Sequence, residues 1–360
     1  MKSFLRMLTV AAAVLTPLTS AHAGSLDREP GVDEVQNAFD SLFGTEVRAP
    51  RTYSPGFERQ LASLAEASRG RIGVAAMDLT TGKMVDVLGN QRFPMASTSK
   101  IAIAATFLEG VDQGRWSLSS EYPLLVPVAS APFSTAVAPV KPGAYLSART
   151  LIDIMITRSN NYATDALLKV VGGPRAVNDW VRRAGISDWQ IDRDIATLVR
   201  DDGAINPATV IDTRDSATPI AMTQMLAGIY QGRWLSRSSR ALLLDAMSRC
   251  VTGKRRIPAM LPAGATVSHK TGSLNNTSSD VGIIETPDGR AFAVAIYVTG
   301  QGTRLARENR IASIARAVYD GYASQPQMPG KPAYAAQDGA TPPRYGNQAS
   351  AARYTQTSAR

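Results

Sequence analysis

Extended apolar segments near both ends of the chain constrain the fold more than any other feature of this sequence. Residues 71–79 and 83–88 have the pattern of two strands joined by a turn that ends at Gly82, and residues 281–285 and 291–298 form a second such pair. The region between the two pairs carries apolar residues at helical spacing. We therefore predict an α/β fold of the sandwich type, in which one antiparallel sheet is completed by both ends of the chain and a helical lobe lies between them.

The periodicity of the apolar residues also predicts where the helices lie and where the longest loop is. Residues 187–217 are polar and irregular, which indicates a long loop. The predicted helices are 57–68, a helix beginning near 97, 151–156, 163–171, 176–184, 222–230, 238–247 and 309–322.

The first 23 residues have the composition of a signal peptide. Lys2 and Arg6 precede an apolar run over 7–18, and Ala21-His22-Ala23 provides a small-residue cleavage site. The apolar run is too short to span a bilayer. We therefore predict export to the periplasm, with no membrane insertion after the signal peptide is cleaved.

Three further segments follow the predicted cleavage site. Residues 24–56 contain three prolines and only a modest helical pattern, so we interpret them as an N-terminal leader. Residues 57–324 contain all the predicted strands and form the expected catalytic domain. Residues 325–360 are rich in Pro, Gln and Ala without periodicity, a composition typical of a disordered tail.

The charge and the rare residue types exclude several classes of function. The chain has a formal net charge of +9, but its export signal and the lack of interleaved basic and aromatic residues argue against a nucleic-acid partner. A carboxylate-bearing substrate or an anionic envelope fits this charge better. Cys250 is the single cysteine, so no disulfide can form within the chain and the fold depends on its apolar core.

Histidine is as rare as cysteine in the mature protein. Only His269 remains after signal cleavage, which excludes a multi-histidine metal site and allows a Ser-His-Asp triad in one place at most. We expect neither a metal nor a cofactor, and we interpret His269 and Cys250 as structural residues. The chemistry must then use Ser, Lys, Asp, Asn and Thr.

A serine and a lysine stand three residues apart where an apolar helix begins. Ser97 and Lys100 would lie on the same face of that helix, so the Lys100 amine can take the proton of the Ser97 hydroxyl. A buried lysine with a lowered pKa is one of the few groups that can activate a serine without histidine. The N-terminal end of the helix also favours an oxyanion.

Two more motifs follow in order. Ser159-Asn160-Asn161 comes after the predicted helix 151–156, and Lys270-Thr271-Gly272 precedes the second strand pair. The ordered set Ser-x-x-Lys, Ser-Asp-Asn and Lys-Thr-Gly is typical of class A β-lactamases and penicillin-binding proteins. Over residues 57–324 the chain resembles this family, and the segments 214–219 and 252–262 also resemble family segments.

The resemblance implies a fold and a set of roles. The β-lactamase/transpeptidase-like fold has an antiparallel five-stranded sheet flanked by helices, plus an all-helical lobe. Ser97 would be the acylated nucleophile and Lys100 its proton partner. Ser159 would relay a proton to the leaving nitrogen, and Asn161 would hold the amide of the substrate side chain.

The remaining implied roles concern the substrate carboxylate and the oxyanion. Lys270 and Thr271 would bind the carboxylate, with Arg256 as a candidate second cation. The backbone N–H groups of Ser97 and Ser273 would form the oxyanion hole. The two lysines flanking one serine can also lower each other's pKa, so that a hydroxyl between them can pass a proton.

The chain departs from the family pattern in two places. Asn160 stands where the family has an aspartate of chiefly structural role. The second departure concerns the glutamate with which class A β-lactamases activate the deacylating water, on a loop closed by an Arg–Asp pair. No glutamate occurs between Glu121 and Glu285.

Two alignments of this loop are open. Counting back without gaps from Asp215 matches residues 200–206 to the family segment, with Asp202 in the place of the glutamate and Asn206 as the second water ligand. Matching residues 191–193 to the family's Leu-Asp-Arg instead puts Ile195 there, without any base. We favour the first alignment, although an aspartate is one methylene shorter than a glutamate and a small misplacement slows catalysis greatly.

These observations predict an exported active-site serine hydrolase that hydrolyses β-lactam amides through an acyl-enzyme at Ser97. The alternative is a penicillin-binding D-Ala-D-Ala peptidase, or a related peptidoglycan amide hydrolase, that deacylates β-lactams slowly. A non-catalytic β-lactam or cell-wall sensor is the third hypothesis. We expect a monomer acting on a small-molecule β-lactam or a peptidoglycan-derived substrate.

Overall fold

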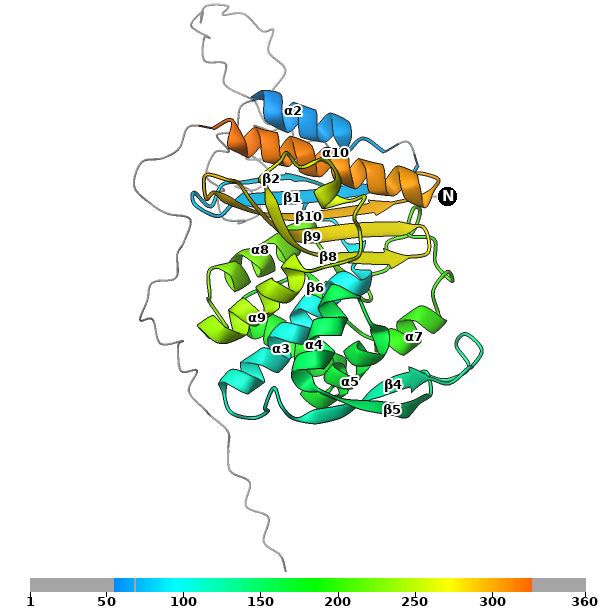
Figure 1. The fold of residues 1–360 in the computed structure, drawn as a ribbon. Coiled ribbons are helices and arrows are strands. Elements are labelled where there is room, and N and C mark those ends of the chain that lie inside the picture. Colours follow the sequence, from blue (N-terminus) through cyan, green and yellow to red (C-terminus); the bar gives the residue numbers. More distant parts are fainter. Residues whose placement is uncertain (1–54, 68, 326–360) are drawn as a thin grey trace, which may run out of the picture. The chain divides into compact units, whose positions relative to one another are not determined.

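A five-stranded antiparallel sheet organises the structure, a computed structural model that describes residues 55–67 and 69–325 (Figure 1). The strand order is β2-β1-β10-β9-β8, so strands from both ends of the chain lie next to each other, and the predicted sheet is confirmed. The strands are β1 (Ile72–Asp78), β2 (Met84–Val87), β8 (Thr266–Leu274), β9 (Thr277–Glu285) and β10 (Ala291–Thr299).

Two helices cover one face of this sheet. Helices α2 (Pro55–Leu64) and α10 (Arg304–Ala323) lie side by side above it in Figure 1. Their apolar side chains pack with those of β1 and β10 in a core that includes Phe57, Val74 and Ile314. Burial of this apolar area stabilises the layer, at about 25 cal/mol per Å² removed from water.

A helical lobe lies beyond the opposite face, as predicted (Figure 1). Its central helix is α3 (Lys100–Asp112), in which every residue from Lys100 to Leu108 is buried, because four other helices of the lobe pack against it. The other helices of this part are α4 (Ala148–Thr157), α5 (Asn161–Val171), α6 (Gly173–Arg183), α8 (Pro219–Tyr230) and α9 (Arg237–Ser248).

Several strands were not predicted. Strands β4 (Glu121–Pro127) and β5 (Val140–Ser147) form a separate two-stranded sheet at the edge of the lobe. Strand β8 carries the Lys-Thr-Gly motif and is the edge strand of the main sheet, at a position where we predicted no strand.

The predicted loop at 187–217 also has more structure than expected. It contains the short helix α7 (Ile195–Arg200) and two short strands, β6 (Trp189–Gln190) and β7 (Ser216–Ala217). Strand β7 lies between β6 and β3 (Phe93–Pro94), which immediately precedes the Ser97 motif. The start and end of the loop are thereby attached next to that motif.

The predicted signal peptide lies outside the described residues, as do nearly all of the predicted leader and tail. Within the residues that the structure describes, no helix combines the length and the apolar character needed to cross a membrane.

Candidate active site

Ser97 and Lys100 lie where a tight turn leads into the central helix. Ser97 is in a 3-10 turn, η1 (Ala96–Ser99), and Lys100 begins α3. The backbone of Ala96 has φ +48°, a left-handed conformation that is uncommon for a residue with a side chain. This conformation changes the direction of the chain immediately before Ser97. The Ser97 side chain is partly exposed, whereas Lys100 is fully buried.

The Lys100 ammonium contacts the second motif. Its Nζ donates to the Ser159 carbonyl oxygen at 2.8 Å, to Ser159 Oγ at 3.3 Å and to Asn161 Oδ1 at 2.7 Å. Ser159 has φ +57° in the turn between α4 and α5, which presents both its carbonyl and its hydroxyl to Lys100. The structure therefore brings Lys100, Ser159 and Asn161 together, while proton transfer from Ser97 to Lys100 stays a prediction.

A second lysine reaches the same hydroxyl from the sheet. Lys270 Nζ, on β8, donates to Ser159 Oγ at 3.0 Å and to the Thr271 carbonyl oxygen at 2.9 Å. Burial, together with the charge of Lys270, holds the pKa of Lys100 well below its usual range. Burial likewise lowers the pKa of Lys270 to about 8, against the opposing charges of Cys250 and Asp280.

The role of the Asn160 side chain explains why an asparagine can replace the family's aspartate at this position. Its side chain caps α5, with Oδ1 accepting a hydrogen bond from the Ala163 N–H at 2.9 Å. Asparagine and aspartate serve about equally well as N-caps. The loss of the family's charge at this position therefore leaves the turn that carries Ser159 and Asn161 intact.

Strand β8 passes directly beside the Ser97 turn. A Cβ on Gly272 would lie 2.5 Å from the Met95 carbonyl oxygen, so only glycine allows this close approach of the two backbones. The approach brings Thr271 and Ser273, on either side of Gly272, to the edge of the site. Thr271 Oγ1 is 2.6 Å from Thr252 Oγ1.

Arg256 lies beneath this edge and not on it. Its side chain is 1% exposed and forms an ion pair with Glu308 at 3.2 Å. One guanidinium nitrogen, Nη1, donates to the carbonyls of Gly272 and Ser279, and the other, Nη2, donates to Ser273 Oγ at 2.7 Å. Arg256 therefore stabilises β8 from behind. Because its guanidinium is buried, the structure does not favour the predicted direct contact with the substrate carboxylate.

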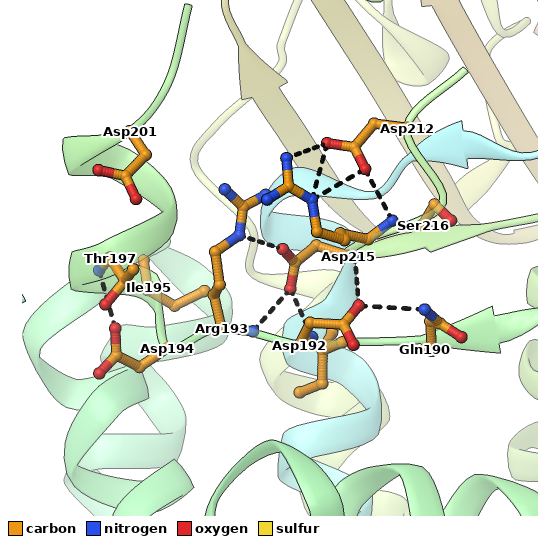
Figure 2. Close-up of polar contacts among 12 residues, drawn as sticks. Gln190, Asp192, Arg193, Asp194, Ile195, Thr197, Asp201, Asp212, Asp215 and Ser216 are labelled. Atoms are coloured by element: carbon orange, nitrogen blue, oxygen red, sulfur yellow. Dashed lines mark hydrogen bonds and ion pairs between the residues drawn. The ribbon is translucent and has the colours of Figure 1, made fainter. Parts of the chain in front are cut away.

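An ion pair between Arg193 and Asp215 closes the loop that precedes α8. Arg193 Nε and Asp215 Oδ2 are 2.6 Å apart, and Asp215 Oδ1 also accepts the N–H groups of Asp192 and Arg193 (Figure 2). Asp194 then caps α7 by accepting the Thr197 N–H at 2.8 Å. Ile195 therefore follows the closing arginine by two residues, at the first position of α7.

This geometry contradicts the alignment that we favoured. Arg200 pairs with its neighbour Asp201 at 2.8 Å and does not close the loop. The carboxylate of Asp202 is exposed and accepts the Asn275 N–H at 2.8 Å. Asn206 Oδ1 similarly accepts from Asn276 Nδ2 at 2.9 Å.

Both side chains therefore hold the turn between β8 and β9. The predicted roles of Asp202 as the deacylating base and of Asn206 as a water ligand lose their basis, because the alignment that assigned them was wrong. The alternative alignment, with Ile195 in the place of the glutamate, agrees with the ion pair between Arg193 and Asp215.

Asp165 is a site residue that the sequence analysis missed. Its carboxylate, on α5, accepts the N–H groups of Ile195 at 2.7 Å and Ala196 at 2.9 Å. Burial raises its pKa to about 7, although these hydrogen bonds act in the opposite direction. A charged residue four positions after Asn161, on the buried face of an apolar helix, is the signal that could have identified it.

Known proteins are similar to this chain over most of its length. The family model described as "Beta-lactamase enzyme family" matches residues 56–322. The chain belongs to this family. Beta-lactamase CTX-M-8 of Citrobacter amalonaticus is 31% identical over 271 residues, which cover 74% of this chain and 89% of that protein. Extended-spectrum beta-lactamase PER-1 of Pseudomonas aeruginosa is 29% identical over 280 residues, which cover 74% of this chain and 87% of PER-1.

Solved structures of related proteins have the same fold. A beta-lactamase from Chitinophaga pinensis superimposes with a TM-score of 0.64 at 29% identity, covering 74% of this chain and 99% of its own. A PBP-A mutant, solved as an acyl-enzyme complex with penicillin G, gives a TM-score of 0.65 at 27% identity over 77% of this chain and 100% of its own. The fold is therefore β-lactamase/transpeptidase-like, and the protein is a serine β-lactamase-like hydrolase.

Proposed function

We propose that this member of the β-lactamase family is an exported hydrolase in which β-lactams acylate Ser97 and deacylation is slow. The observation that carries the proposal is the Ser159 hydroxyl, to which Lys100 and Lys270 both donate, from α3 and β8 respectively. Such a hydroxyl can pass a proton between the two amines and toward a leaving nitrogen. Export follows from the N-terminal sequence.

Acylation requires Lys100 to be neutral when it accepts the Ser97 proton. The lowered pKa of Lys100 supports this role, because burial and the nearby Lys270 charge favour the uncharged amine. Ser97 and Ser273 would supply the backbone N–H groups for the oxyanion, and the close approach at Gly272 supports their proximity. Lys270 and Thr271 would then bind the substrate carboxylate.

Slow deacylation follows from the side chain at the start of α7. Ile195 cannot accept a proton, so the loop position at which the family uses a glutamate supplies no base for the water. This feature also favours the second candidate function, a penicillin-binding peptidase. A similar structure, a PBP-A mutant, was solved as an acyl-enzyme complex with penicillin G. In both cases Ser97 is the group that is acylated.

The experiment is a time course of intact-mass spectra of the mature protein with benzylpenicillin. We expect a stoichiometric adduct that persists for minutes or longer and is absent from Ser97→Ala. Ser99→Ala is the matched control, because Ser99 follows the nucleophile by two residues but is buried, with its hydroxyl donating to the Ala96 carbonyl. An adduct on Ser97→Ala would contradict the assignment.

The two candidate functions differ in their substrate. Release of D-alanine from an acyl-D-Ala-D-Ala peptide, faster than the turnover of benzylpenicillin, would select the peptidase. Turnover of benzylpenicillin with no release of D-alanine would select the β-lactam hydrolase. The variant Asp202→Asn should leave both rates unchanged, since the Asp202 carboxylate binds the β8–β9 turn.

A further inference from the structure

An open cleft of about 510 Å³ lies between the segment 251–255 and the first turn of α10. Three of the side chains that line it are cations, those of Lys254, Arg255 and Arg304, and one is the carboxylate of Glu308. A cleft of this size is within the range that holds small molecules. It therefore has both the room and the excess of positive charge that an anionic group requires.

Two of these cations are free to bind an anion. Arg304 Nε pairs with Glu308 Oε1 at 3.0 Å, and the same oxygen accepts from the buried Arg256 at 3.3 Å. Among the residues that the structure describes, neither the Lys254 ammonium nor the Arg255 guanidinium has an ion-pair or hydrogen-bond partner. Both residues are exposed. An anion that enters the cleft would thus meet two unpaired cations, while the carboxylate that could repel it is already paired with two arginines.

The two unpaired cations stand at the tip of a tight turn. The Arg256 N–H donates to the Gly253 carbonyl oxygen at 2.8 Å, so Lys254 and Arg255 are the central residues of a four-residue turn. Gly253 has φ +71°, a conformation that favours glycine. Arg256 anchors the turn to β8, because its guanidinium donates to the Gly272 carbonyl oxygen at 2.8 Å. The turn therefore holds its two cations at a fixed place beside β8.

The same turn packs against the proposed substrate site. A Cβ on Gly253 would lie 2.3 Å from Thr271 Cγ2, so the backbone of the turn directly contacts the Thr271 side chain. The preceding hydroxyl, Thr252 Oγ1, lies 2.6 Å from Thr271 Oγ1. Lys270 and Thr271 are the residues proposed to bind the substrate carboxylate. The cleft, which Gly253 lines, therefore begins directly beside that carboxylate.

This position assigns the cleft to one side of the substrate. In benzylpenicillin the carboxylate belongs to the ring fused to the lactam nitrogen, so a group that extends past the carboxylate belongs to the leaving side. Asn161, proposed to hold the amide of the acyl side chain, lines a different cavity together with Ile195. The exposed apolar side chains of Val251 and Leu305 lie beside the cations, and they can contact the ring or linker that carries an anion.

We propose that Lys254, Arg255 and Arg304 form a subsite for a second anionic group, a carboxylate or sulfonate on the leaving side of the substrate. This inference rests on the proposed function and narrows its substrate class to acyl donors whose leaving part carries two anionic groups. A single exposed ion pair contributes little, but several cations that act on one anion contribute together. The formal net charge of +9 also attracts such a dianion from a distance.

The test compares cefonicid with cefamandole. These cephalosporins have the same acyl side chain, and the tetrazole on their leaving side carries a sulfomethyl group in cefonicid and a methyl group in cefamandole. Acylation of Ser97, followed by intact mass at low ionic strength, should be roughly three- to tenfold faster with cefonicid. The ratio of the two rates should fall in Lys254→Ala, should fall to about one in Lys254→Ala/Arg255→Ala, and should decrease as salt is added.

Lys83→Ala is the matched control for Lys254→Ala. Lys83 is an exposed lysine that precedes β2, at the opposite edge of the sheet from β8, and its loss removes the same charge from the protein. The ratio of the two rates should stay at the wild-type value in this variant. An equal fall of the ratio in Lys83→Ala would assign the preference to the overall charge and overturn the subsite. Equal rates for the two cephalosporins in the wild type would also overturn it, with the proposed function left standing.

Binding to Ser97→Ala separates this inference from the proposed function. This variant cannot form the acyl-enzyme, so calorimetric titration measures affinity alone, and cefonicid should bind roughly three- to tenfold more tightly than cefamandole. If neither compound acylates the wild type but this difference in affinity is found, the proposed function fails and the subsite stands. Equal affinities, or no binding of either compound, would overturn the subsite.

Discussion

The carboxylate of Asp165 accepts the backbone N–H of Ile195 at 2.7 Å, which joins helix α5 to the first residue of α7. Helix α5 begins at Asn161, so one helix both provides a site residue and holds the loop that follows the site. The second oxygen of Asp165 accepts the Ala196 N–H. Because both N–H groups belong to the first turn of α7, the carboxylate also stabilises the N-terminal end of that helix.

Asp165→Asn should change how stability depends on pH. Burial raises the folded-state pKa of Asp165 to about 7, above the ordinary aspartate value of 3.8, so the fold disfavours its ionised form. The resulting penalty is absent below pH 4 and complete above pH 7. Between pH 5 and pH 8 the wild type should lose about 2–3 kcal/mol of unfolding free energy relative to Asp165→Asn.

Urea unfolding of both proteins at pH 5 and pH 8 measures this difference. Asp179→Asn is the control, because Asp179 is a surface residue whose exposed side chain pairs with Arg182 on the same helix. Its pH dependence should match that of the wild type. Parallel pH dependences of the wild type and Asp165→Asn would contradict the prediction.

Ile195→Glu should accelerate deacylation. The substitution puts a carboxylate two residues after the arginine that closes the loop, where the family has its general base. A positioned general base contributes roughly 10²–10⁴-fold to a rate, and we expect the lower end because the surrounding residues are unadapted. Loss of the benzylpenicillin adduct with time, measured by intact mass, gives the rate.

The matched control is Ile195→Gln, because a glutamine side chain has nearly the same shape as a glutamate side chain but cannot act as a general base. The adduct should persist in Ile195→Gln as it does in the wild type. Equal deacylation rates in the glutamate and glutamine variants would show that the side chain at 195 does not reach the water.

The rate of acylation should fall above pH 8. The Lys270 ammonium, whose pKa burial lowers to about 8, is the cation proposed to bind the substrate carboxylate. Below that pH the cation is present, and above it the neutral amine attracts the carboxylate less. Acylation rates of benzylpenicillin between pH 6 and pH 10 should therefore show a single downward step.

The methyl ester of benzylpenicillin provides the control for this profile. It lacks the carboxylate, so it should react more slowly at neutral pH and show no loss of rate at the Lys270 titration. The same downward step with both substrates would assign the titration to proton transfer and not to substrate binding.

Arg193→Ala should destabilise the protein by about 2–3 kcal/mol, because it leaves the buried Asp215 carboxylate without its counterion. The side chain of Asp215 is 5% exposed and that of Arg193 17%. Arg316→Ala breaks a surface pair whose side chains are 43% and 48% exposed, so it should cost less than about 1 kcal/mol. Urea unfolding of the two variants makes the comparison, and equal losses would contradict the prediction.

The main sheet and the motif residues could be predicted because their signals are local. Apolar runs identified the strands around Val74 and Val294, and short fixed spacings identified Lys100, Ser159 and Lys270, which the structure brings together. Strands β4 and β5 gave no such signal, since prolines interrupt them and most of their side chains are partly exposed. Helix α7, with six residues, is too short for a period to be recognised.

The loop alignment failed for a different reason. Arg200 followed by two aspartates resembles the family segment as closely as Arg193 does, and counting back from Asp215 without gaps favoured Arg200. The choice depends on which arginine reaches Asp215 in space, a contact across more than twenty residues that the spacing along the chain does not determine. Asp165 was missed likewise, because its partners are backbone groups thirty residues away.

The pairing of β1 with β10 joins residues 72–78 to residues 292–298, at opposite ends of the described chain. Until the ribosome has made the last strand, β1 has β2 on one side and an open edge on the other. Contacts this distant in sequence make folding slow, since a long loop must close before they form. The order of synthesis therefore delays completion of the sheet until β10, and with it almost the whole domain, has been made.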